Sequence, residues 1–393
     1  MQLSLDEEEL ALLSEVRRFV QKEIVPLEHD MDPDAVELDP ENYARLVEKT
    51  KEMGLYNLEL PEEFGGPGIS TTLHCLIAME TSQHRAGLYA AAYNVFGHPG
   101  QIPLLSAYAN DDQKERYLYP SVRGEKKACF ALSEASGGSD PGRSIITRAV
   151  QDGDDWIING SKLWISGALE ADFAVLFART GGPGRDGVTA FLVDTDTPGF
   201  TVSSVVHTLR STKPGTEIAL QDVRVPSANI LGGLGNGFKM ANHRLAKNRI
   251  PYSAACVGVA VKAQELAVEY AKVRQAFGEN LIDHQGLNWM LVENEMDIRN
   301  ATMMVLLAAD RADRGLPFRS DAAAAKIAAT EAAARVVDRA IQVHGGMGVS
   351  KEMPLERWYR ELRIRRIGEG ATEVQKMLVG RELKYNPYKF FLY

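Results

Sequence analysis

Three glycine-punctuated segments of this 393-residue chain combine small, hydroxyl and aromatic residues that could hold a flat ligand. In the first, FALSEASGGSD from Phe130 to Asp140, a predicted strand leads into a loop of small residues, where the backbone can approach a ligand closely. The second is Trp164-Ile165-Ser166, an aromatic wall beside a hydroxyl, and the third is HGGMG at 344–348, which ends a helix. Taken singly, each is also typical of a turn, a core segment or a helix C-cap.

Common phosphate and metal motifs are absent or fail in their context. Residues 182–187 (GPGRDG) match GxGxxG, but the next residues, VTAFLVD, predict a strand, whereas a dinucleotide fingerprint must open a helix. We therefore interpret 182–187 as a hairpin loop. The chain has no Gly-Lys dipeptide for a P-loop and no HExxH or CxxC spacing, so no metal site is predicted.

Helical periodicity dominates both ends of the chain. Residues 1 to about 120 repeat apolar positions at helical spacing, and Ser4 with Glu7 is a candidate capping box. Towards the C-terminus, four long amphipathic helices with short connections suggest a bundle, and the third has an Ala-rich sequence of high helix propensity. They are predicted at 238–273, 284–315, 319–343 and 372–384.

Strand-forming residues fill the segment from about 124 to 232. Asn159-Gly160, between the strand-forming runs 156–158 and 162–165, predicts a hairpin with a type I′ turn. Further strands are predicted at 173–177, 188–193, 200–206 and 217–225. We therefore expect an N-terminal helical domain at 1–122, a middle β domain at 123–235 and a C-terminal helical domain at 236–393.

Charge and cysteine content limit the function classes. Lys plus Arg number 44 and Asp plus Glu 53, so the net charge is −9, which argues against a general nucleic-acid binder. Three cysteines and an acidic start without a basic n-region indicate no disulfide framework and no secretory signal, so we expect a reducing, cytoplasmic location. The uncharged stretch 86–110 is interrupted by GHPG at 97–100, so we expect buried helices there rather than a membrane span.

Five spaced motifs resemble the acyl-CoA dehydrogenase family, in order and over almost the whole chain. FALSEASGGSD resembles the flavin segment TEPGAGSD, and INGSKLWIS at 158–166 resembles NGxKxWIT. LQDVRVPSANILGGLGNGF at 220–238 resembles DVRVPxxNxLGxxGxGF, and RQAFGENLIDHQ at 274–285 resembles RxxFGxxLxxxQ. Residues 341–375 resemble QxxGGxGxxxExPxERxxRDxRxxxIxEGTxxIQ. Five motifs in register are far more specific than any single glycine pattern.

The resemblance implies an α+β fold with an N-terminal helical domain, a middle β-barrel and a C-terminal four-helix bundle. It also implies bound FAD and a homotetramer in which a neighbouring subunit contacts the flavin. The cofactor-binding residues implied on the flavin side are Phe130, Leu132, Ser133, Ser139, Trp164, Ile165 and Ser166, with Ala371 and Glu373. Those implied to contact the pyrophosphate and adenosine across the subunit interface are Arg274, Phe277, Gln342, Gly345 and Gly346.

The reaction that the resemblance implies is α,β-dehydrogenation of an acyl-CoA, with hydride passing to flavin N5 and electrons to an electron-transfer flavoprotein. Removal of the weakly acidic α-proton needs a carboxylate whose pKa is raised in a dry pocket. Glu369 matches that base and precedes a helix that Thr372 and Gln375 would cap, although composition alone favours a solvated loop acid. The residues implied to contact substrate are Ser139, Asn248, Arg249 and Gly370; Asn248 stands where some members carry the base and cannot accept a proton.

Several positions depart from the family pattern. Ala246 replaces an Asp that helps to hold the CoA arm, Ala371 and Glu373 replace a Thr and a Gln, and the pattern at 209–220 is shifted around Pro214. Gly368 stands where many members carry a bulky residue beside the acyl chain. We therefore expect a preference for branched, cyclic or otherwise bulky acyl groups, unless Gly368 only supplies a backbone conformation forbidden to other residues.

Two other functions remain open alongside the dehydrogenase. One is a related flavin oxidase that gives electrons to oxygen, such as an acyl-CoA oxidase or a nitroalkane oxidase. The other is a non-catalytic partner subunit of a hetero-oligomeric dehydrogenase. The nitroalkane oxidase base is expected to be Asp, and a non-catalytic subunit would not need Glu369 beside an intact flavin wall, so the dehydrogenase is favoured.

Overall fold

The computed structural model describes residues 5–58, 60–97, 100–210 and 215–385, and it divides into two compact units. The first unit holds residues 5–58, 66–97 and 246–385, and the second holds 60–65 and, outside the gap at 211–214, 100–245. The expected order along the chain, with helical N- and C-terminal regions and a sheet in the middle, is confirmed. The domain boundaries at 122/123 and 235/236 stay predictions.

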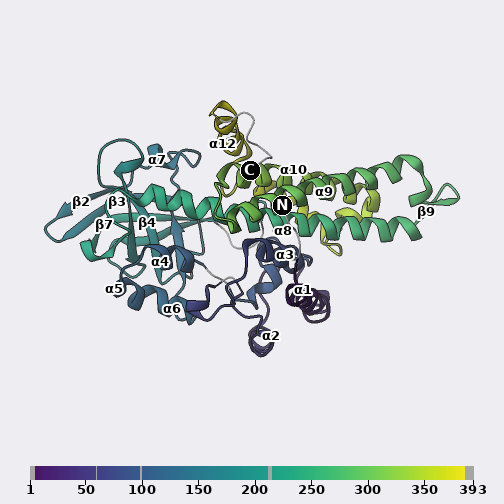
Figure 1. The fold of residues 1–393 in the computed structure, drawn as a ribbon, viewed down its shortest axis with the longest axis horizontal. Helices are drawn as coiled ribbons and strands as arrows, with labels where there is room; N and C mark the ends of the chain where they lie inside the picture. Colours follow the sequence, from purple (N-terminus) through teal and green to yellow (C-terminus); the bar gives the residue numbers. More distant parts are fainter. Residues whose placement is uncertain (1–4, 59, 98–99, 211–214, 386–393) are drawn as a thin grey trace. The chain divides into compact units, whose positions relative to one another are not determined.

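An eight-stranded sheet forms the centre of the second unit (Figure 1). Its strands are β1 (Ala128–Ala131), β2 (Arg148–Asp152), β3 (Asp155–Ser166), β4 (Phe173–Arg179), β5 (Val188–Asp194), β6 (Phe200–Val206), β7 (Gly215–Pro226) and β8 (Ile230–Leu231). They follow the order β6-β7-β3-β2-β4-β5-β8, with β1 parallel to β4 beside this path. The strands predicted from Phe173 onward are confirmed as β4 to β7, and the GxGxxG segment is the loop between β4 and β5.

The strand β3 runs without interruption from Asp155 to Ser166, so the hairpin predicted at Asn159-Gly160 is wrong. Gly160 has φ +149°, and the register of β3 against β7 shifts between Ile158 and Gly160, which marks a bulge. A Cβ at Gly160 would lie 2.7 Å from the Cα of Thr147, so the glycine permits close approach of a neighbouring backbone. The chain reverses earlier, at Gly153 between β2 and β3.

The sheet encloses an apolar interior. The ring centroids of Trp156 on β3 and Phe191 on β5 lie 5.9 Å apart, although β3 and β5 are not neighbours in the sheet. Side chains of β4 alternate between this interior, where Leu176 lies, and the outer face, where Phe177 lies. The sheet therefore curves around its own core, as in a barrel.

Short helices cover the outer face of this sheet. Buried residues such as Leu105 and Leu118 join Phe173, Val175 and Phe177 of β4 in one apolar cluster. The helices of the second unit are α4 (Ile102–Tyr108), α5 (Asp111–Gln113), α6 (Tyr119–Val122) and α7 (Pro141–Ser144).

The first unit begins with three helices, α1 (Glu7–Phe19), α2 (Pro40–Glu52) and α3 (Thr71–Thr81). The side chain of Asp6 accepts a hydrogen bond from the Glu9 N–H at 2.8 Å, and the Glu9 carboxylate accepts one from the Asp6 N–H at 3.1 Å. This capping box begins α1. Ser4, which the sequence suggested as the cap, lies outside the described residues.

Long helices make up the rest of the first unit, and α8, α9 and α10 run alongside one another (Figure 1). The helices are α8 (Gly237–Val273), which begins in the second unit, α9 (Gln285–Asp313), α10 (Arg319–His344), α11 (Leu355–Arg365) and α12 (Thr372–Tyr385). A hairpin of β9 (Gln275–Ala276) and β10 (Glu279–Asn280) joins α8 to α9. The four predicted long helices are confirmed, and α11 is a further helix that periodicity did not single out.

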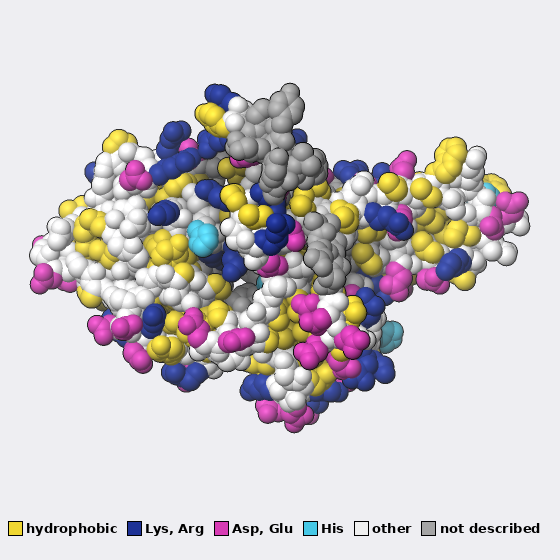
Figure 2. All heavy atoms as spheres, viewed as in Figure 1, with side chains coloured by type: hydrophobic (Ala, Val, Ile, Leu, Met, Phe, Trp, Pro, Cys, Tyr) yellow, Lys and Arg dark blue, Asp and Glu magenta, His cyan; other side chains and the backbone are white. Residues whose placement is uncertain are grey.

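On the face seen in Figure 2, Lys and Arg side chains are interspersed with Asp and Glu side chains. The three cysteines, Cys75, Cys129 and Cys256, are free and buried. Within the described ranges, no helix combines the length and the apolar character needed to cross a lipid bilayer.

Candidate active site

The residues predicted to face a flavin lie where β1 ends beside the end of β3, in the second unit. The Ser133 carbonyl accepts a hydrogen bond from the Leu163 N–H, and the Ser133 hydroxyl donates one to the Leu163 carbonyl, both at 2.9 Å. The Phe130 ring packs on Phe177, with 4.9 Å between the ring centroids. These contacts bring the 130–140 and 164–166 segments together, as the sequence motifs require.

Trp164 provides a flat wall at this edge of the sheet. Its φ is +66°, and the register of β3 shifts between Leu163 and Ile165, so 55% of the Trp164 surface is exposed. A large exposed indole is stabilised when an apolar planar group covers it, and an exposed hydroxyl, Ser166, lies two residues away. The wall therefore fits a planar aromatic cofactor.

The other predicted flavin-side residues differ in how they could contribute. Leu132 and Ile165 are buried, so only their backbone groups can contact a ligand. Ser139 is exposed in the loop before α7, where its hydroxyl is accessible.

A buried ion pair behind this wall was not found by sequence reasoning. Lys162 Nζ donates to Glu134 Oε1 at 2.7 Å and to the Leu132 carbonyl at 3.3 Å, and neither charged side chain is appreciably exposed. The Glu134 carboxylate also accepts hydrogen bonds from the N–H groups of Ile146 and Thr147. Burial lowers the pKa of Lys162 to about 8 despite Glu134. Burial raises the pKa of Glu134, but Lys162 and the donors outweigh it, so its pKa lies below the ordinary value.

Glu369 lies in a left-handed turn in the first unit, between α11 and α12 (the Glu369 turn, residues 368–370). Its φ is +56° and that of Gly370 is +97°. A non-glycine residue in this region costs about 1–2 kcal/mol, so the surrounding contacts must hold it. Two buried cations bind the carbonyls of the turn: Arg249 Nε donates to the Glu369 carbonyl at 2.9 Å, and Lys326 Nζ donates to the Gly370 carbonyl at 2.6 Å.

Burial weakens the protonation of both cations. It lowers the pKa of Arg249, and it lowers the pKa of Lys326 to about 8, because the charged forms lose hydration inside the protein. Arg249 was predicted from its motif, whereas Lys326 was not. Asn248 is partly exposed beside Arg249 on α8. Successive helical residues point about 100° apart, so Asn248 faces another direction than Arg249.

The capping box predicted for α12 is wrong. The Thr372 hydroxyl donates to Glu331 Oε1 at 3.1 Å, and the Gln375 N–H donates to the Ala371 carbonyl. Gln375 Nε2 instead reaches back to the Gly370 carbonyl at 3.1 Å and becomes a third donor to the turn. Of the two implied cofactor contacts, Ala371 is partly exposed and Glu373 is exposed.

Gly368 is not in the left-handed region, so the backbone explanation offered for it is wrong. A Cβ added there would lie 3.0 Å from the hydroxyl of Tyr252, which is tighter than ordinary contact. Tyr252 on α8 therefore fills part of the space that the missing side chain leaves. Of the altered segment at 209–220, residues 211–214, with Pro214, lie outside the described residues.

The five residues implied in a subunit interface gather at one end of the helices of the first unit. Gly345, with φ +58°, ends α10, and Gln342 and Gly346 beside it are exposed. The rings of Tyr270 and His344 stack at 4.6 Å, which places the end of α8 next to the end of α10. Arg274 follows Tyr270 and is exposed.

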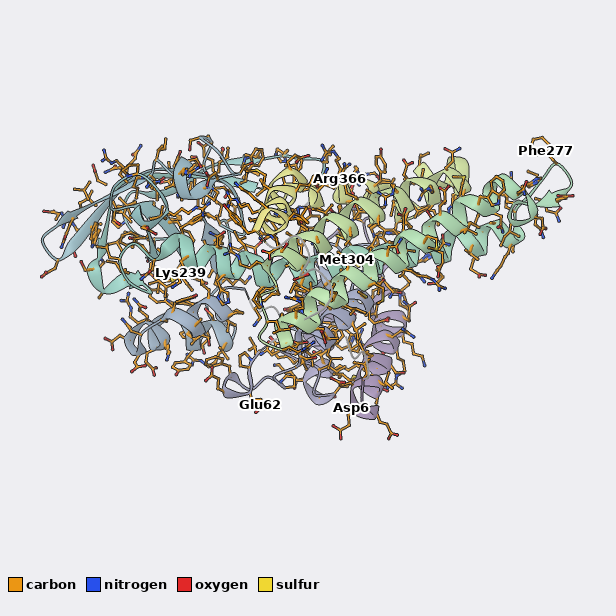
Figure 3. The ribbon with its side chains drawn as sticks, turned by 45° about the horizontal axis from the view of Figure 1, so that its top comes forward. Asp6, Glu62, Lys239, Phe277, Met304 and Arg366 are labelled. Atoms are coloured by element: carbon orange, nitrogen blue, oxygen red, sulfur yellow. The ribbon has the colours of Figure 1, made fainter. Side chains whose placement is uncertain are left out.

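Phe277 is the most exposed residue of this group. It lies at the tip of the β9–β10 hairpin, beyond the helices (Figure 3), and is 100% exposed with φ +51°. Lys326, which binds the Glu369 turn, and Gln342 are 342 − 326 = 16 residues apart on α10, so roughly 24 Å of helix separates the two groups. The Glu369 turn and the residues implied in a subunit interface thus lie far apart along α10.

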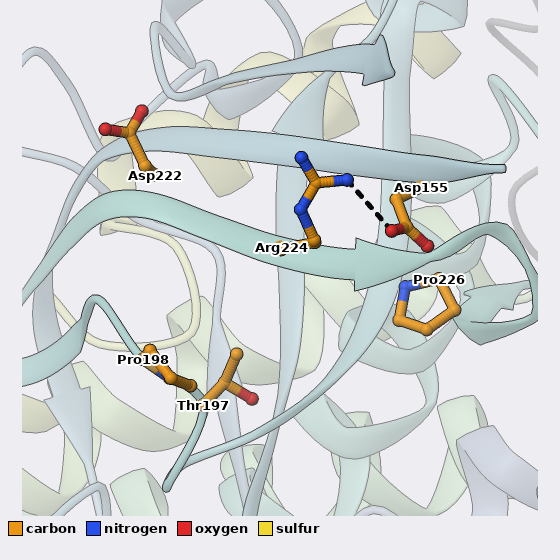
Figure 4. Close-up of a pocket in the computed structure, with 6 residues that line it drawn as sticks. All are labelled: Asp155, Thr197, Pro198, Asp222, Arg224 and Pro226. Atoms are coloured by element: carbon orange, nitrogen blue, oxygen red, sulfur yellow. Dashed lines mark hydrogen bonds and ion pairs between the residues drawn. The ribbon is translucent and has the colours of Figure 1, made fainter. Parts of the chain in front are cut away.

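A pocket of about 510 Å³ in the second unit is separate from all the predicted residues (Figure 4). It is lined by Asp155, Thr197, Pro198, Asp222, Arg224 and Pro226. Arg224 pairs with Asp152 at 2.6 Å and with Asp155 at 2.9 Å, so its charge is already balanced. Among the described residues that line this pocket, the only guanidinium is therefore engaged in ion pairs.

Comparison with known proteins identifies the family. The N-terminal, middle and C-terminal domain models of acyl-CoA dehydrogenase match residues 6–125, 129–223 and 235–384. The chain is 36% identical over 385 residues to the human mitochondrial short-chain specific acyl-CoA dehydrogenase, covering 97% of this chain and 91% of that protein. It is 34% identical to the acryloyl-CoA reductase (NADH) of Anaerotignum propionicum, covering 98% and 96%.

A solved structure agrees with these matches. Butyryl-CoA dehydrogenase from Megasphaera elsdenii superposes with a TM-score of 0.86 at 32% identity and covers 98% of this chain and 100% of that one. Both the sequence matches and this fold run over nearly the full length of the chain. The chain belongs to the acyl-CoA dehydrogenase family of FAD-binding oxidoreductases.

Proposed function

We propose that this chain catalyses the FAD-dependent α,β-dehydrogenation of an acyl-CoA to the 2-enoyl-CoA, with Glu369 as the base. The observation that carries the proposal is the Glu369 turn, in which buried Arg249 and Lys326 hold the carbonyls of Glu369 and Gly370. Holding a glutamate in a strained conformation with two buried cations costs free energy. A solvated loop acid would gain nothing from that cost, whereas a base must be held in a fixed position.

The chain's residues divide the work of the reaction. The Glu369 carboxylate takes the α-proton, and the two held carbonyls keep the backbone from relaxing as it does so. The indole of Trp164, fixed through Ser133 and Leu163, would cover one face of the bound cofactor and exclude water from it. Bound FAD supplies the hydride acceptor.

The remaining partners follow from the same proposal. Arg274, Phe277, Gln342, Gly345 and Gly346 would contact the cofactor of a neighbouring copy in a homotetramer, which fits their exposure in a single chain. Ser139, Asn248, Arg249 and Gly370 would contact the acyl-CoA, with Arg249 acting through the turn that it holds. Electrons would leave to an electron-transfer flavoprotein, and the protein would act in the cytoplasm.

Replacement of the base tests the proposal. We expect Glu369→Gln to keep the fold and bound FAD but to reduce the flavin about 10²- to 10⁴-fold more slowly, because the amide cannot accept the α-proton. The measurement is stopped-flow bleaching of the flavin by acyl-CoAs without air. Glu352→Gln, an exposed residue between α10 and α11, is the matched control. Near-normal bleaching of the Glu369→Gln flavin would assign the base to another residue.

A second candidate is the reverse reaction, reduction of an enoyl thioester, which the acryloyl-CoA reductase relative favours. Glu369 would then donate the proton that it accepts in the forward direction. Incubation of the chemically reduced holoenzyme with crotonyl-CoA distinguishes the two. Rapid reoxidation of the flavin, with slow bleaching by butyryl-CoA, would favour the reductase.

A further inference from the structure

Arg365, the last residue of α11, is a buried cation that lacks hydrogen-bond acceptors. Only 6% of its surface is exposed, and its Nε is buried with no hydrogen-bond partner. Across the described residues, no side-chain hydrogen bond and no ion pair within 4.0 Å joins its guanidinium to an acceptor. Glu361, one turn earlier in α11, interacts electrostatically with Arg365, but its Oε1 accepts a hydrogen bond from Arg357 Nε at 3.1 Å, so its charge is shared between two arginines.

Two tyrosine rings provide the surroundings of this guanidinium. Its central carbon lies 4.0 Å from the ring centroid of Tyr252 and 4.6 Å from that of Tyr89. Such cation–π contacts stabilise the charge but supply no hydrogen-bond acceptor for the buried Nε–H. A buried charge normally pairs with acceptors, so an acceptor from outside the chain is expected here.

Tyr252 connects Arg365 with the Glu369 turn. Its hydroxyl donates to the Arg365 carbonyl at 3.4 Å and lies 3.0 Å from the position of a Cβ on Gly368, next to Glu369. Arg249, one turn earlier on α8, binds the Glu369 carbonyl. The guanidinium thus lies beside the place where the acyl group must meet the base.

The charge balance of this region favours an anion. Lys326 lies 5.9 Å from the Tyr252 ring, so together with Arg249 and Arg365 three buried cations surround the turn. Arg249 and Lys326 bind carbonyls, and the carboxylate of Glu369, which interacts electrostatically with both, balances only part of the three positive charges. A negatively charged group carried by the substrate would offset this surplus.

We propose that Arg365 is a specificity-determining residue that binds a carboxylate on the acyl group, so that the substrate is the mono-CoA thioester of a dicarboxylic acid. The inference rests on the proposed function of Glu369, since it places the substrate at the same turn. Arg365 is 94% buried within a single chain, so a slender acyl chain is a better source of the carboxylate than the side chain of another subunit.

Matched pairs of thioesters test the inference on the FAD-loaded enzyme. The pairs are butyryl- and succinyl-CoA, hexanoyl- and adipyl-CoA, and octanoyl- and suberyl-CoA, with the ω-amide of adipyl-CoA as an uncharged acceptor. We expect the carboxylate member of at least one pair to reduce the flavin with roughly 10- to 100-fold higher kcat/KM, since charged hydrogen bonds contribute this much. Equal values within all pairs, or an amide as good as the carboxylate, would overturn the inference.

Variants of Arg365 test whether its guanidinium causes the preference for the carboxylate-bearing thioesters. Arg365→Met should abolish the preference for the carboxylate member, and Arg365→Lys should retain part of it, because the charge remains while the planar fork is lost. Arg363→Met, an exposed arginine on the same helix, is the matched control and should keep the wild-type preference. If Arg365→Met folds and keeps the preference, another residue binds the carboxylate. If it does not fold, the wild-type pairs and Arg365→Lys decide.

Binding separates this inference from the proposed function. Calorimetric titration of the Glu369→Gln holoenzyme with adipyl- and hexanoyl-CoA, and with the other pairs, measures affinity without turnover. Should no thioester of either series reduce the wild-type flavin, the proposed function fails while the affinity ratio still decides the role of Arg365. Tighter binding of a carboxylate member supports the inference, and equal affinities in every pair contradict it.

Discussion

The two buried lysines near the predicted site residues differ in the groups that they contact. Lys162 forms an ion pair with a buried carboxylate, whereas Lys326 donates a hydrogen bond to the uncharged carbonyl of Gly370. Burial lowers the pKa of both lysines to about 8, so the charge is costly in both. They differ in what a mutation leaves behind: loss of Lys162 strands a buried carboxylate, whereas loss of Lys326 leaves a carbonyl without its donor.

Breaking the Lys162–Glu134 pair should be worse than removing it. In Lys162→Met, the buried Glu134 carboxylate keeps its backbone donors but loses its counter-charge, which costs about 3–5 kcal/mol of unfolding free energy. Lys162→Met/Glu134→Gln removes both charges and should recover much of that loss. Urea unfolding of the FAD-loaded proteins measures both. A double variant as unstable as Lys162→Met, or more so, would contradict the role of the pair.

The pH dependence of stability should report on Lys326. Its pKa is lowered to about 8 from an ordinary 10.5 because it is buried. Between these values the unfolded state binds more protons than the native state, so the unfolding free energy rises with pH. We expect the difference between wild type and Lys326→Met to shift in favour of wild type by up to about 3 kcal/mol from pH 7 to pH 10.5.

Thermal or urea unfolding at several pH values measures this difference. Other groups titrate in both proteins and largely cancel, so the comparison isolates the lysine. A difference that stays flat from pH 7 to pH 10.5 would show that Lys326 keeps an ordinary pKa.

Sequence reasoning reached Glu369, Arg249 and Trp164 because short motifs surround them. It missed Lys326, which lies in an Ala-rich helix whose pattern indicates only helix propensity, and whose acceptor is 44 residues away. Lys162 was part of a quoted motif, but its partner Glu134 lies 28 residues earlier. Pairing over such separations depends on the folded strands and helices, which no local pattern specifies.

Among the elements, β3 shows where local signals mislead. Asn-Gly between strand-forming runs favours a type I′ hairpin, yet the strand continues because β7 pairs with it along its length. The sequence correctly indicates that Gly160 adopts a backbone conformation that favours glycine. In the structure, however, this conformation forms a bulge against Thr147 rather than a turn. The helices were predicted better, since a long 3.6-residue period leaves less room for an alternative. Predicting that β3 continues through Asn159-Gly160 requires tertiary information.

Substitution at this bulge tests its structural reason. A Cβ at Gly160 would meet Thr147 Oγ1 at 2.6 Å and its Cα at 2.7 Å, at a φ of +149° that disfavours side chains. We expect Gly160→Ala to lower the unfolding free energy by about 3 kcal/mol through strain and overpacking. Gly153→Ala, also at positive φ but in open space, should lose only about 1 kcal/mol. Similar losses in the two variants, measured in urea, would show that crowding at Gly160 is unimportant.

At the scale of the whole molecule, the residues implied in catalysis and in cofactor binding fall into separate groups. The residues implied to bind the pyrophosphate and adenosine lie roughly 24 Å along α10 from the Glu369 turn. They are exposed, and a fully exposed Phe277 is unfavourable in water. Sequence motifs named these residues, and their exposure supports the proposal that a second copy contacts them.

Removal of the Phe277 ring should weaken both assembly and cofactor retention. Covering a phenylalanine contributes about 1.5–3 kcal/mol, so Phe277→Ala should raise the dissociation constant of each interface roughly 10- to 100-fold. Because the hairpin would contact the FAD of a neighbouring copy, flavin should be lost as the oligomer dissociates. Size-exclusion chromatography with light scattering across a dilution series, followed by flavin absorbance of each peak, measures the two together. Leu10→Ala, which shortens an exposed apolar side chain on α1, is the control. A Phe277→Ala protein that keeps both its oligomeric state and its flavin on dilution would remove the hairpin from the interface and leave the cofactor to be held within one chain.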